Sequence, residues 1–254
     1  MWDAGQYLKY SEERSRPFLD LLARVRTEPA DFIADLGCGP GNLTRILVER
    51  WPAARVVGVD NSPAMLEQAR PLTIPGRLDF MRADLTSWTP DKPVDLIVSN
   101  AALQWVPDHE TLLTRLAGML SAGGTLAVQM PYLFKNPAQL VIEETKADPR
   151  WSAGLHGVGL DQKSVQPLLW YVERLHNLGL AVDAWETTYI HVLTGENPVL
   201  EWFKGTALRP LLNALEPQTQ IKFLHELGSR LKAAYPEKEN VTLLPFPRLF
   251  LVAN

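Results

Sequence analysis

The stretch that decides the fold is Phe32-Ile33-Ala34-Asp35-Leu36-Gly37-Cys38-Gly39-Pro40-Gly41-Asn42. It begins with an apolar run of strand length that carries an acid near its end. Three glycines at alternate positions follow, and they let the backbone turn sharply and let a ligand approach closer than a Cβ atom would permit. Apolar residues at helical spacing come next, at Leu43, Ile46 and Leu47. The stretch therefore predicts a strand, a glycine loop and a helix, which is the turn where open parallel sheets bind ligands.

The same alternation of short apolar runs and helical patterns continues to residue 130, after an amphipathic entry helix over 11–26. Strands separated by helices need crossover connections, so we expect a doubly wound, mostly parallel, Rossmann-like α/β sheet. Two later apolar runs bring the expected sheet to seven strands. The predicted strands cover 32–36, 55–60, 78–82, 94–100, 124–130, 182–192 and 247–252, and the intervening helices cover 43–49, 63–70 and 108–120.

The remaining sequence predicts a cap on this sheet. Residues 131–168 are rich in Gly, Pro and Trp, and 197–235 is mostly helical with many Leu and aromatic residues. We interpret 131–165 and 195–240 as insertions that pack together over the carboxyl edge of the sheet and enclose a pocket. The whole chain, 1–254, then forms one domain with a cofactor-binding core at about 30–130.

Composition narrows the class of partner. The chain has 254 residues, 46% of them hydrophobic, and a net charge of −4, and its Lys and Arg are scattered rather than gathered in a basic stripe. We expect a small-molecule substrate, no nucleic acid and no membrane, because no apolar segment approaches roughly 20 residues. The single Cys38 and the lack of a targeting segment indicate a cytoplasmic protein. The five His lack partners at ligand spacing, so we expect no metal. We expect a monomer or weak dimer.

The glycine loop favours one ligand over two others. A phosphate-binding loop would need a Gly-Lys-Ser/Thr ending, which is absent. Dinucleotide sites use Gly-x-Gly-x-x-Gly, whereas this loop has Gly37, Gly39 and Gly41 at alternate positions and Asp35 just before them. A carboxylate there would repel a diphosphate but would suit a ligand with a cationic amino-acid end. The pattern therefore indicates S-adenosylmethionine.

Later strand ends carry side chains that fit the same ligand. Asp60 ends the second strand, where a carboxylate can accept from both hydroxyls of a ribose. Asp84 follows the third strand and could accept from an adenine amino group, while Asn100 ends the fourth strand beneath the methionine arm. The predicted cofactor-binding residues are thus Asp35, Gly37, Gly39, Gly41, Asp60, Asn61, Asp84, Leu85 and Asn100.

These motifs carry a family resemblance. Residues 33–130 resemble a class I S-adenosylmethionine-dependent methyltransferase, with Ala83-Asp84-Leu85, Asn100 to Trp105 and Ser121-Ala122-Gly123-Gly124-Thr125 in order after the glycine loop. More widely, the chain resembles the bacterial trans-aconitate 2-methyltransferase family in Trp2-Asp3 with Tyr7, Glu13-Arg14-Ser15-Arg16-Pro17, Trp185-Glu186-Thr187-Thr188-Tyr189 and Glu201 to Pro210. The resemblance adds Tyr7 to the cofactor residues. It implies carboxyl methylation of trans-aconitate to a monomethyl ester, with S-adenosylhomocysteine as the other product and detoxification of an aconitase inhibitor as the purpose.

Such a reaction sets requirements for the acceptor site. An ionised carboxylate needs no general base near neutral pH, so the protein has to place it in line with the methyl group. An arginine on the reacting carboxylate would weaken the nucleophile, so we expect Arg209 to hold a spectator carboxylate. Weaker donors, namely Gln104, Tyr10 and His156, are candidates for the reacting one, and Trp105 for a wall. Arg14, Arg16 and Arg248 fit a solvated face or a helix end better than a substrate site.

Three other functions use related sequences. A methyltransferase acting on a carrier-bound malonyl group would need a basic docking face, and no basic cluster is evident. A non-catalytic module that binds S-adenosylmethionine would not need the Asn100 to Trp105 segment or a filled cap. Methylation of DNA base amino groups usually uses Pro-Pro-aromatic after the fourth strand, and Ser99-Asn100-Ala101-Ala102 differs.

Overall fold

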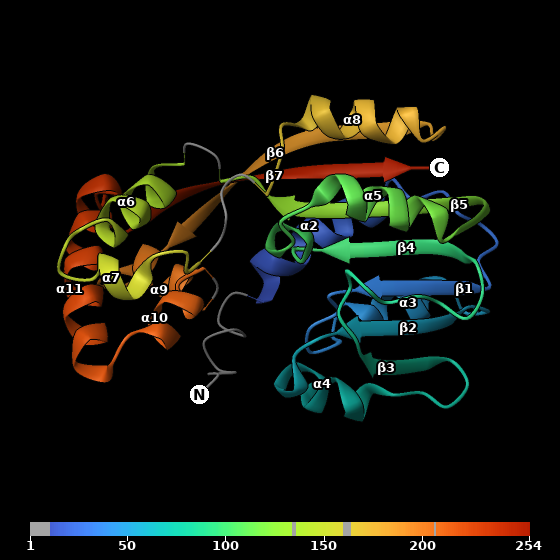
Figure 1. The fold of residues 1–254 in the computed structure, drawn as a ribbon, viewed down its shortest axis with the longest axis horizontal. Helices are drawn as coiled ribbons and strands as arrows, with labels where there is room; N and C mark the ends of the chain where they lie inside the picture. Colours follow the sequence, from blue (N-terminus) through green and yellow to red (C-terminus); the bar gives the residue numbers. More distant parts are fainter. Residues whose placement is uncertain (1–10, 134–135, 160–163, 206) are drawn as a thin grey trace.

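The computed structural model describes residues 11–133, 136–159, 164–205 and 207–254. They form a seven-stranded sheet in the order β3-β2-β1-β4-β5-β7-β6, in which β7 runs in the opposite direction to the other strands (Figure 1). The predicted mostly parallel sheet is confirmed. Its strands are β1 (Phe32–Leu36), β2 (Arg55–Asp60), β3 (Leu78–Arg82), β4 (Val94–Asn100), β5 (Leu120–Pro131), β6 (Val182–Leu193) and β7 (Thr242–Ala253).

Helices cover both faces of the sheet. On one face, α2 (Ser11–Leu22) and α3 (Thr44–Arg50) bury a stripe that includes Phe18 and Leu47 against Ile33 of β1. On the other, α5 (His109–Gly118) and α8 (Leu168–Asn177) pack Leu112 and Tyr171 into a second apolar cluster. Burial on both faces explains why the inner strands β1, β2 and β4 are mostly apolar, whereas β3 at the edge is largely exposed. Two further elements flank β2 and β3, namely α4 (Pro63–Ala69) and a 3-10 turn, η1 (Arg70–Leu72).

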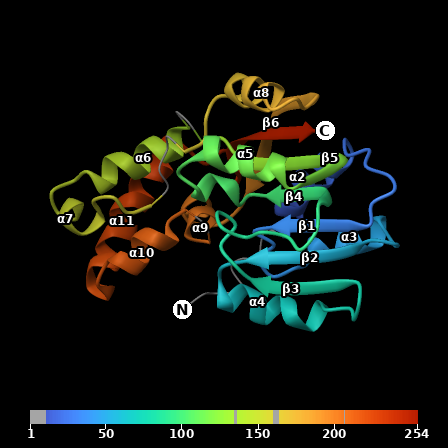
Figure 2. The same ribbon diagram turned by 45° about the vertical axis from the view of Figure 1, so that its right-hand side comes forward.

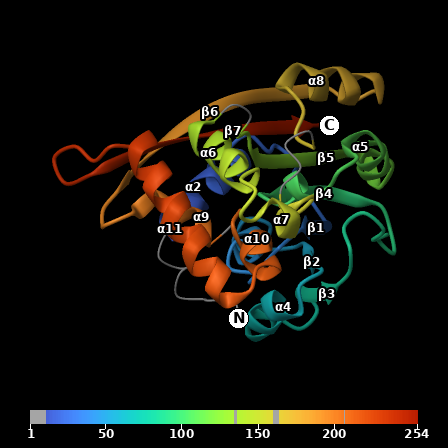
Figure 3. The ribbon, with the colours of Figure 1, turned by 60° about the vertical axis from the view of Figure 1, so that its left-hand side comes forward.

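The cap lies beyond the carboxyl ends of the parallel strands (Figures 1 and 2). It has its own apolar cluster, in which Trp202, Phe203 and Phe223 are almost fully buried. The helix α11 lies alongside α6, and β6 and β7 reach out from the sheet to the cap (Figure 3). The cap helices are α6 (Pro137–Lys146), α7 (Ser152–Leu155), α9 (Pro198–Lys204), α10 (Arg209–Ala214) and α11 (Pro217–Ala234).

Strand β7 begins well before the predicted residue 247. Two prolines, Pro245 and Pro247, lie in this strand, although proline lacks the N–H that a central strand donates. In the structure, β5 pairs with β7 only from Arg248 onward, while β6 pairs along the full length from Thr242. The carbonyl of Pro247 accepts from Tyr132 N at 2.9 Å, so the backbone of Pro247 faces the side where β5 has ended. The missing N–H groups therefore interrupt no ladder.

Among the described residues, no helix is long and apolar enough to cross a membrane. The same part of the chain brings together no group of three or more His, Cys, Asp and Glu side chains that could hold a metal ion.

Candidate active site

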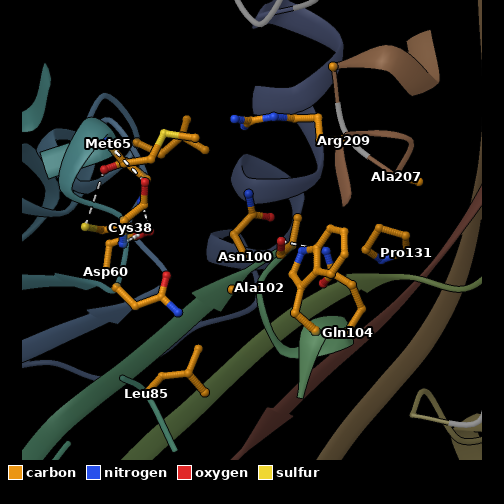
Figure 4. A pocket seen from close by; sticks show the side chains of 18 of the residues that line it. Cys38, Asp60, Met65, Leu85, Asn100, Ala102, Gln104, Pro131, Ala207 and Arg209 are labelled. Carbon is orange, nitrogen blue, oxygen red and sulfur yellow. Dashed lines mark hydrogen bonds between the residues drawn. The ribbon is translucent and has the colours of Figure 1, made fainter. Parts of the chain in front are cut away.

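A cavity of about 700 Å³ lies between the carboxyl edge of the sheet and the cap. Its lining comes from the segments that follow β1 to β5 on one side and from α9, α10 and β7 on the other. Figure 4 shows Cys38, Asp60 and Met65 on one side of this space and Arg209 and Pro131 on the other. The cavity thus has a sheet half, formed by strand ends, and a cap half.

The glycine loop bounds the sheet half. All three glycines have positive φ, at 77°, 55° and 79° for Gly37, Gly39 and Gly41. A Cβ added to Gly37 would lie 2.2 Å from the Ala102 side chain, so the loop can pack against the segment after β4 only with glycine there. A Cβ on Gly39 would meet nothing within 4 Å, because Gly39 faces the open cavity.

Gly41 has a packing role in the structure. A Cβ at this position would lie 2.6 Å from the Phe80 ring, and Gly41 is not among the residues that line the cavity. Of the three predicted glycines, Gly37 and Gly39 therefore reach the cavity, and Gly41 lets the loop pack against β3.

Asp60 links the loop to the end of β2. Its Oδ2 accepts from Gly39 N at 2.9 Å, and its Oδ1 accepts from Ser62 N at 2.8 Å. These bonds hold the carboxylate at the cavity wall, where the next residue, Asn61, also lies. Each oxygen keeps a lone pair for a ligand hydroxyl.

Asp35 is 3% exposed and lines the cavity beneath the loop. Its Oδ2 accepts from Thr44 Oγ1 at 2.6 Å. Burial raises the pKa of Asp35 to about 7, the Thr44 hydroxyl lowers it, and the charge of Asp60 raises it. A cation bound beside Asp35 would favour the ionised form, so this carboxylate suits an ammonium group.

Cys38 lies between these acids. Burial raises the pKa of its thiol, and the charges of Asp35 and Asp60 raise it further. The residue is therefore a small neutral side chain of the loop rather than a thiolate nucleophile.

The structure places Asp84 away from the cavity. Ala83 and Leu85 line it, whereas Asp84 is exposed and its Oδ1 accepts from both the N and the Oγ1 of Thr86, at 2.8 and 2.6 Å. These bonds lower the pKa of Asp84. The expected contact of this carboxylate with an adenine amino group is thus not supported by its position, and Leu85 is the member of the motif that reaches the cavity.

Asn100 and Gln104 bring unsatisfied polar atoms to the site. Both line the cavity, and Asn100 Oδ1 and Gln104 Oε1 are buried without a hydrogen-bond partner among the described residues. Gln104 lies in a 3-10 turn, η2 (Leu103–Trp105), and its Nε2 donates to Ala101 O at 2.7 Å. Buried polar atoms of this kind are costly unless a ligand or water meets them. Asn100 Oδ1, Gln104 Oε1 and the open space beside Gly39 therefore form a binding site that offers hydrogen-bond acceptors. The ammonium and the ribose hydroxyls of S-adenosylmethionine are donors that fit such a site.

A buried hydrogen-bond chain supports η2 from behind. His109 Nε2 donates to Leu103 O at 2.8 Å, so its Nδ1 is the acceptor for the Tyr171 hydroxyl at 2.5 Å. Burial lowers the pKa of His109, which favours this neutral form. The chain fixes the turn that carries Gln104 and Trp105.

The cap half is aromatic and cationic. Trp202, Phe203 and Phe246 line it, Trp105 of η2 lines the cavity from the sheet half, and Arg209 points into the cavity from the start of α10 (Figure 4). Burial lowers the pKa of Arg209. Arg209, Gln104 and Trp105 thus line the same cavity, but Gln104 presents the acceptor Oε1 to it, where the expected contact with a carboxylate requires a donor.

Other predicted residues lie elsewhere. His156 is exposed at the end of α7 and does not line the cavity. Its expected contact with the reacting carboxylate is therefore not supported, because the cap turns it toward solvent. Tyr7 and Tyr10 lie outside the described residues.

Arg248 is the site residue that sequence reasoning missed. It lies on β7, is 4% exposed and lines the cavity, and its Nη1 donates to Gln129 Oε1 at 3.1 Å. The solvated position expected for Arg248 is wrong, because β7 is buried between β5 and β6 at this residue. The available signal was its position directly before the apolar run Leu249 to Val252, because a charged residue next to a buried strand is unusual unless it is paired or functional.

Comparisons with known proteins agree with this geometry. Residues 33–124 match a family model described as a methyltransferase domain. The chain is 49% identical to a trans-aconitate 2-methyltransferase of Streptomyces avermitilis, covering 100% of this chain and 96% of that protein. It is 45% identical to a trans-aconitate 2-methyltransferase of Methylobacterium nodulans, covering 100% and 98%.

Solved structures share the fold. An S-adenosylmethionine-dependent methyltransferase from Mesorhizobium loti superposes with a TM-score of 0.53 at 20% identity, covering 93% of this chain and 97% of that chain. The YcgJ protein of Bacillus subtilis gives a TM-score of 0.60 at 13% identity, covering 93% and 96%.

Proposed function

The chain belongs to the trans-aconitate 2-methyltransferase family, and from that premise we propose that it methylates one carboxylate of trans-aconitate with S-adenosylmethionine. The products are a monomethyl ester and S-adenosylhomocysteine. The observation that carries the proposal is the placement of two guanidinium groups, Arg209 and Arg248, in the half of the cavity that faces the glycine loop. A polyanionic acceptor fits these charges.

The sheet half holds the cofactor in this proposal. Asp60 and Asn61 meet the ribose, Gly37 and Gly39 let the ligand approach the backbone, and Asp35 meets the ammonium. Leu85 packs on the adenine ring, and Asn100 faces the methionine arm. When bound, S-adenosylmethionine supplies a methyl group on a positively charged sulfur.

The cap half places the acceptor. A carboxylate with a pKa of about 4 is ionised near neutral pH, so no residue has to remove a proton. Arginines bind carboxylates through two parallel hydrogen bonds, and we assign Arg209 to a carboxylate that does not react. Trp105 lies beside the position of the reacting group, and Gln104 Oε1 is an acceptor for the cofactor. The aromatic rings exclude water, which otherwise solvates the nucleophile.

We propose the cytoplasm as the place of action and a monomer or weak dimer as the state of the protein. The scattered basic residues and the net charge of −4 support a free small molecule rather than a nucleic acid or a membrane surface as the partner. Removal of an aconitase inhibitor is the purpose that this activity would serve.

The test is transfer of a labelled methyl group to a panel of acceptors, namely trans-aconitate, the dicarboxylates mesaconate and itaconate, and malonyl carrier protein. We expect label in the monomethyl ester of trans-aconitate, identified by mass spectrometry. Transfer to the carrier protein alone would support the alternative acceptor, and cofactor binding without any transfer would support a non-catalytic module. Either result would overturn the proposal.

A further inference from the structure

The charges that line the cavity divide between its two halves. The lining in the described part of the chain includes two acids, Asp35 and Asp60, and both lie in the sheet half. The cap half contains Arg209 and Arg248 and, among the described residues, no acidic side chain. A ligand that fills the cap half therefore meets two positive charges and should carry at least two negative ones.

The two arginines approach from different elements. Arg209 stands at the start of α10, beside Pro210, whereas Arg248 lies within β7 and pairs in register with Pro131 of β5 and Thr187 of β6. Arg209 is half-buried and Arg248 is buried. Separate origins and different burial favour two binding points for two anionic groups rather than one shared point.

Arg248 is held in a fixed orientation. Its guanidinium lies over the Phe246 ring at 5.0 Å from the centroid, and Gln129 Oε1 accepts from its Nη1. Gln129 is fully buried, and its Cα pairs in register with Asn100 of β4. Asn100 and Gln129 are thus neighbours across β4 and β5, and the Gln129 side chain connects to Arg248, which lies two residues before Phe250, the register partner of Gln129 on β7.

Gln129 acts on a ligand only through Arg248. Its Oε1 accepts from Arg248 Nη1, and the residue is fully buried and does not line the cavity, whereas Arg248 does. The guanidinium of Arg248 is therefore the group of this pair that can meet an anion. A carboxylate is the group that accepts from a guanidinium in a planar, two-bond arrangement.

We propose that Arg248, oriented by Gln129, binds a second spectator carboxylate, so that the site selects acceptors with three carboxylates over those with two. The inference rests on the proposed function and assigns its acceptor specificity. Arg209 holds one spectator group and Arg248 the other, while the reacting carboxylate stays off both guanidinium groups and keeps its nucleophilicity.

Removing a carboxylate from the ligand and the guanidinium from the protein tests this pairing. Mesaconate, itaconate and (Z)-glutaconate each lack a different carboxylate of trans-aconitate. Calorimetry on protein saturated with S-adenosylhomocysteine gives the affinity of all four acids for the wild type, Arg248→Gln and the charge-retaining Arg248→Lys. We expect Arg248→Gln to lower the affinity for trans-aconitate about 100-fold. The affinity for one dicarboxylate, the one that lacks the carboxylate bound by Arg248, should stay nearly unchanged. Arg248→Lys, which keeps the charge, should lower the affinity for trans-aconitate less than Arg248→Gln does.

Matched variants separate binding from structure. Gln129→Leu should lower the affinity for trans-aconitate less than Arg248→Gln, because the Arg248 guanidinium keeps its charge and loses only the hydrogen bond that orients it. Arg150→Gln removes an exposed cap arginine and should change nothing. An equal loss for all four acids in Arg248→Gln would show a structural role and overturn the pairing, as would no loss for any of them. Failure of the proposed function is distinct, since the wild type itself would then neither bind nor methylate trans-aconitate.

Discussion

Gly39 N donates to Asp60 Oδ2 at 2.9 Å, so the loop after β1 and the acid at the end of β2 form one unit. This hydrogen bond stabilises the conformation of the loop and also fixes the orientation of the Asp60 carboxylate. Residues far apart in the sequence thus meet at the edge of the sheet, as expected for parallel strands.

Replacing Asp60 should weaken the binding of the cofactor. In Asp60→Asn, the side-chain N–H₂ would face one of the two backbone donors, Gly39 N or Ser62 N, so one of the two hydrogen bonds is lost along with the charge. We expect the affinity for S-adenosylhomocysteine to fall about 10- to 100-fold in calorimetry. Asp84→Asn is the matched control, because that carboxylate bonds to Thr86 outside the cavity, and it should change the affinity by less than about threefold. A larger effect of Asp84→Asn would return that carboxylate to the adenine site.

Alanine at the two cavity glycines should separate folding from binding. Gly37→Ala places a Cβ against Ala102 and should lower the free energy of unfolding by about 1–3 kcal/mol beyond the cost of the positive φ. Gly39→Ala bears only the cost of the positive φ, roughly 1–2 kcal/mol, but fills space meant for the ligand. Urea unfolding and calorimetry with S-adenosylhomocysteine measure both effects. The reverse order of stabilities would contradict the loop geometry.

Asp35 should make the stability of the ligand-free protein depend on pH. The unfolded chain loses this proton near pH 3.8, but the folded protein keeps it until about 7. Between these values the folded state binds more protons, so its stability falls as the pH rises, by about 1.4 kcal/mol for each pH unit.

Asp35→Asn lacks this proton and isolates the effect. The unfolding free energy of the wild type, measured relative to that of Asp35→Asn, should fall from pH 4 to pH 7 and stay constant at higher pH. A difference that stays constant over this range would show that Asp35 is ionised in the folded protein.

Tyr171→Phe should loosen the turn that carries Gln104. The change leaves His109 Nδ1 buried without its partner, which should cost about 1–3 kcal/mol in unfolding free energy. Tyr235→Phe is the control, since it removes a hydroxyl from the cap, at Asn136, and leaves η2 intact. Only Tyr171→Phe should lower kcat as well as stability, and equal kcat values in the two variants would speak against support of η2 by this chain.

Arg209→Gln should raise the KM for trans-aconitate about 100-fold, while the affinity for S-adenosylhomocysteine stays within about threefold. Arg150→Gln, on the outside of the cap, serves as the control. An unchanged KM would remove Arg209 from the acceptor site, and a loss of cofactor affinity would move it to the sheet half.

The parallel core was predictable because its signals are local. The bounds of β1 to β4 match the prediction, since each strand is a short apolar run with a turn after it. The turned carboxylate of Asp84 also has a local cause, because Thr86 follows at the spacing of an Asx turn. The site of Arg248 has no such signal. Its burial depends on the pairing of β7 with both β5 and β6, which are distant from it in the sequence.

The central claim is that the two arginines hold the carboxylates that do not react. The most direct measurement is a crystal structure of the protein with S-adenosylhomocysteine and trans-aconitate bound together. We predict Arg209 on one carboxylate, Arg248 on a second, and the third, free of both guanidinium groups, nearest the sulfur. A carboxylate clamped by either arginine and lying nearest the sulfur would contradict this account.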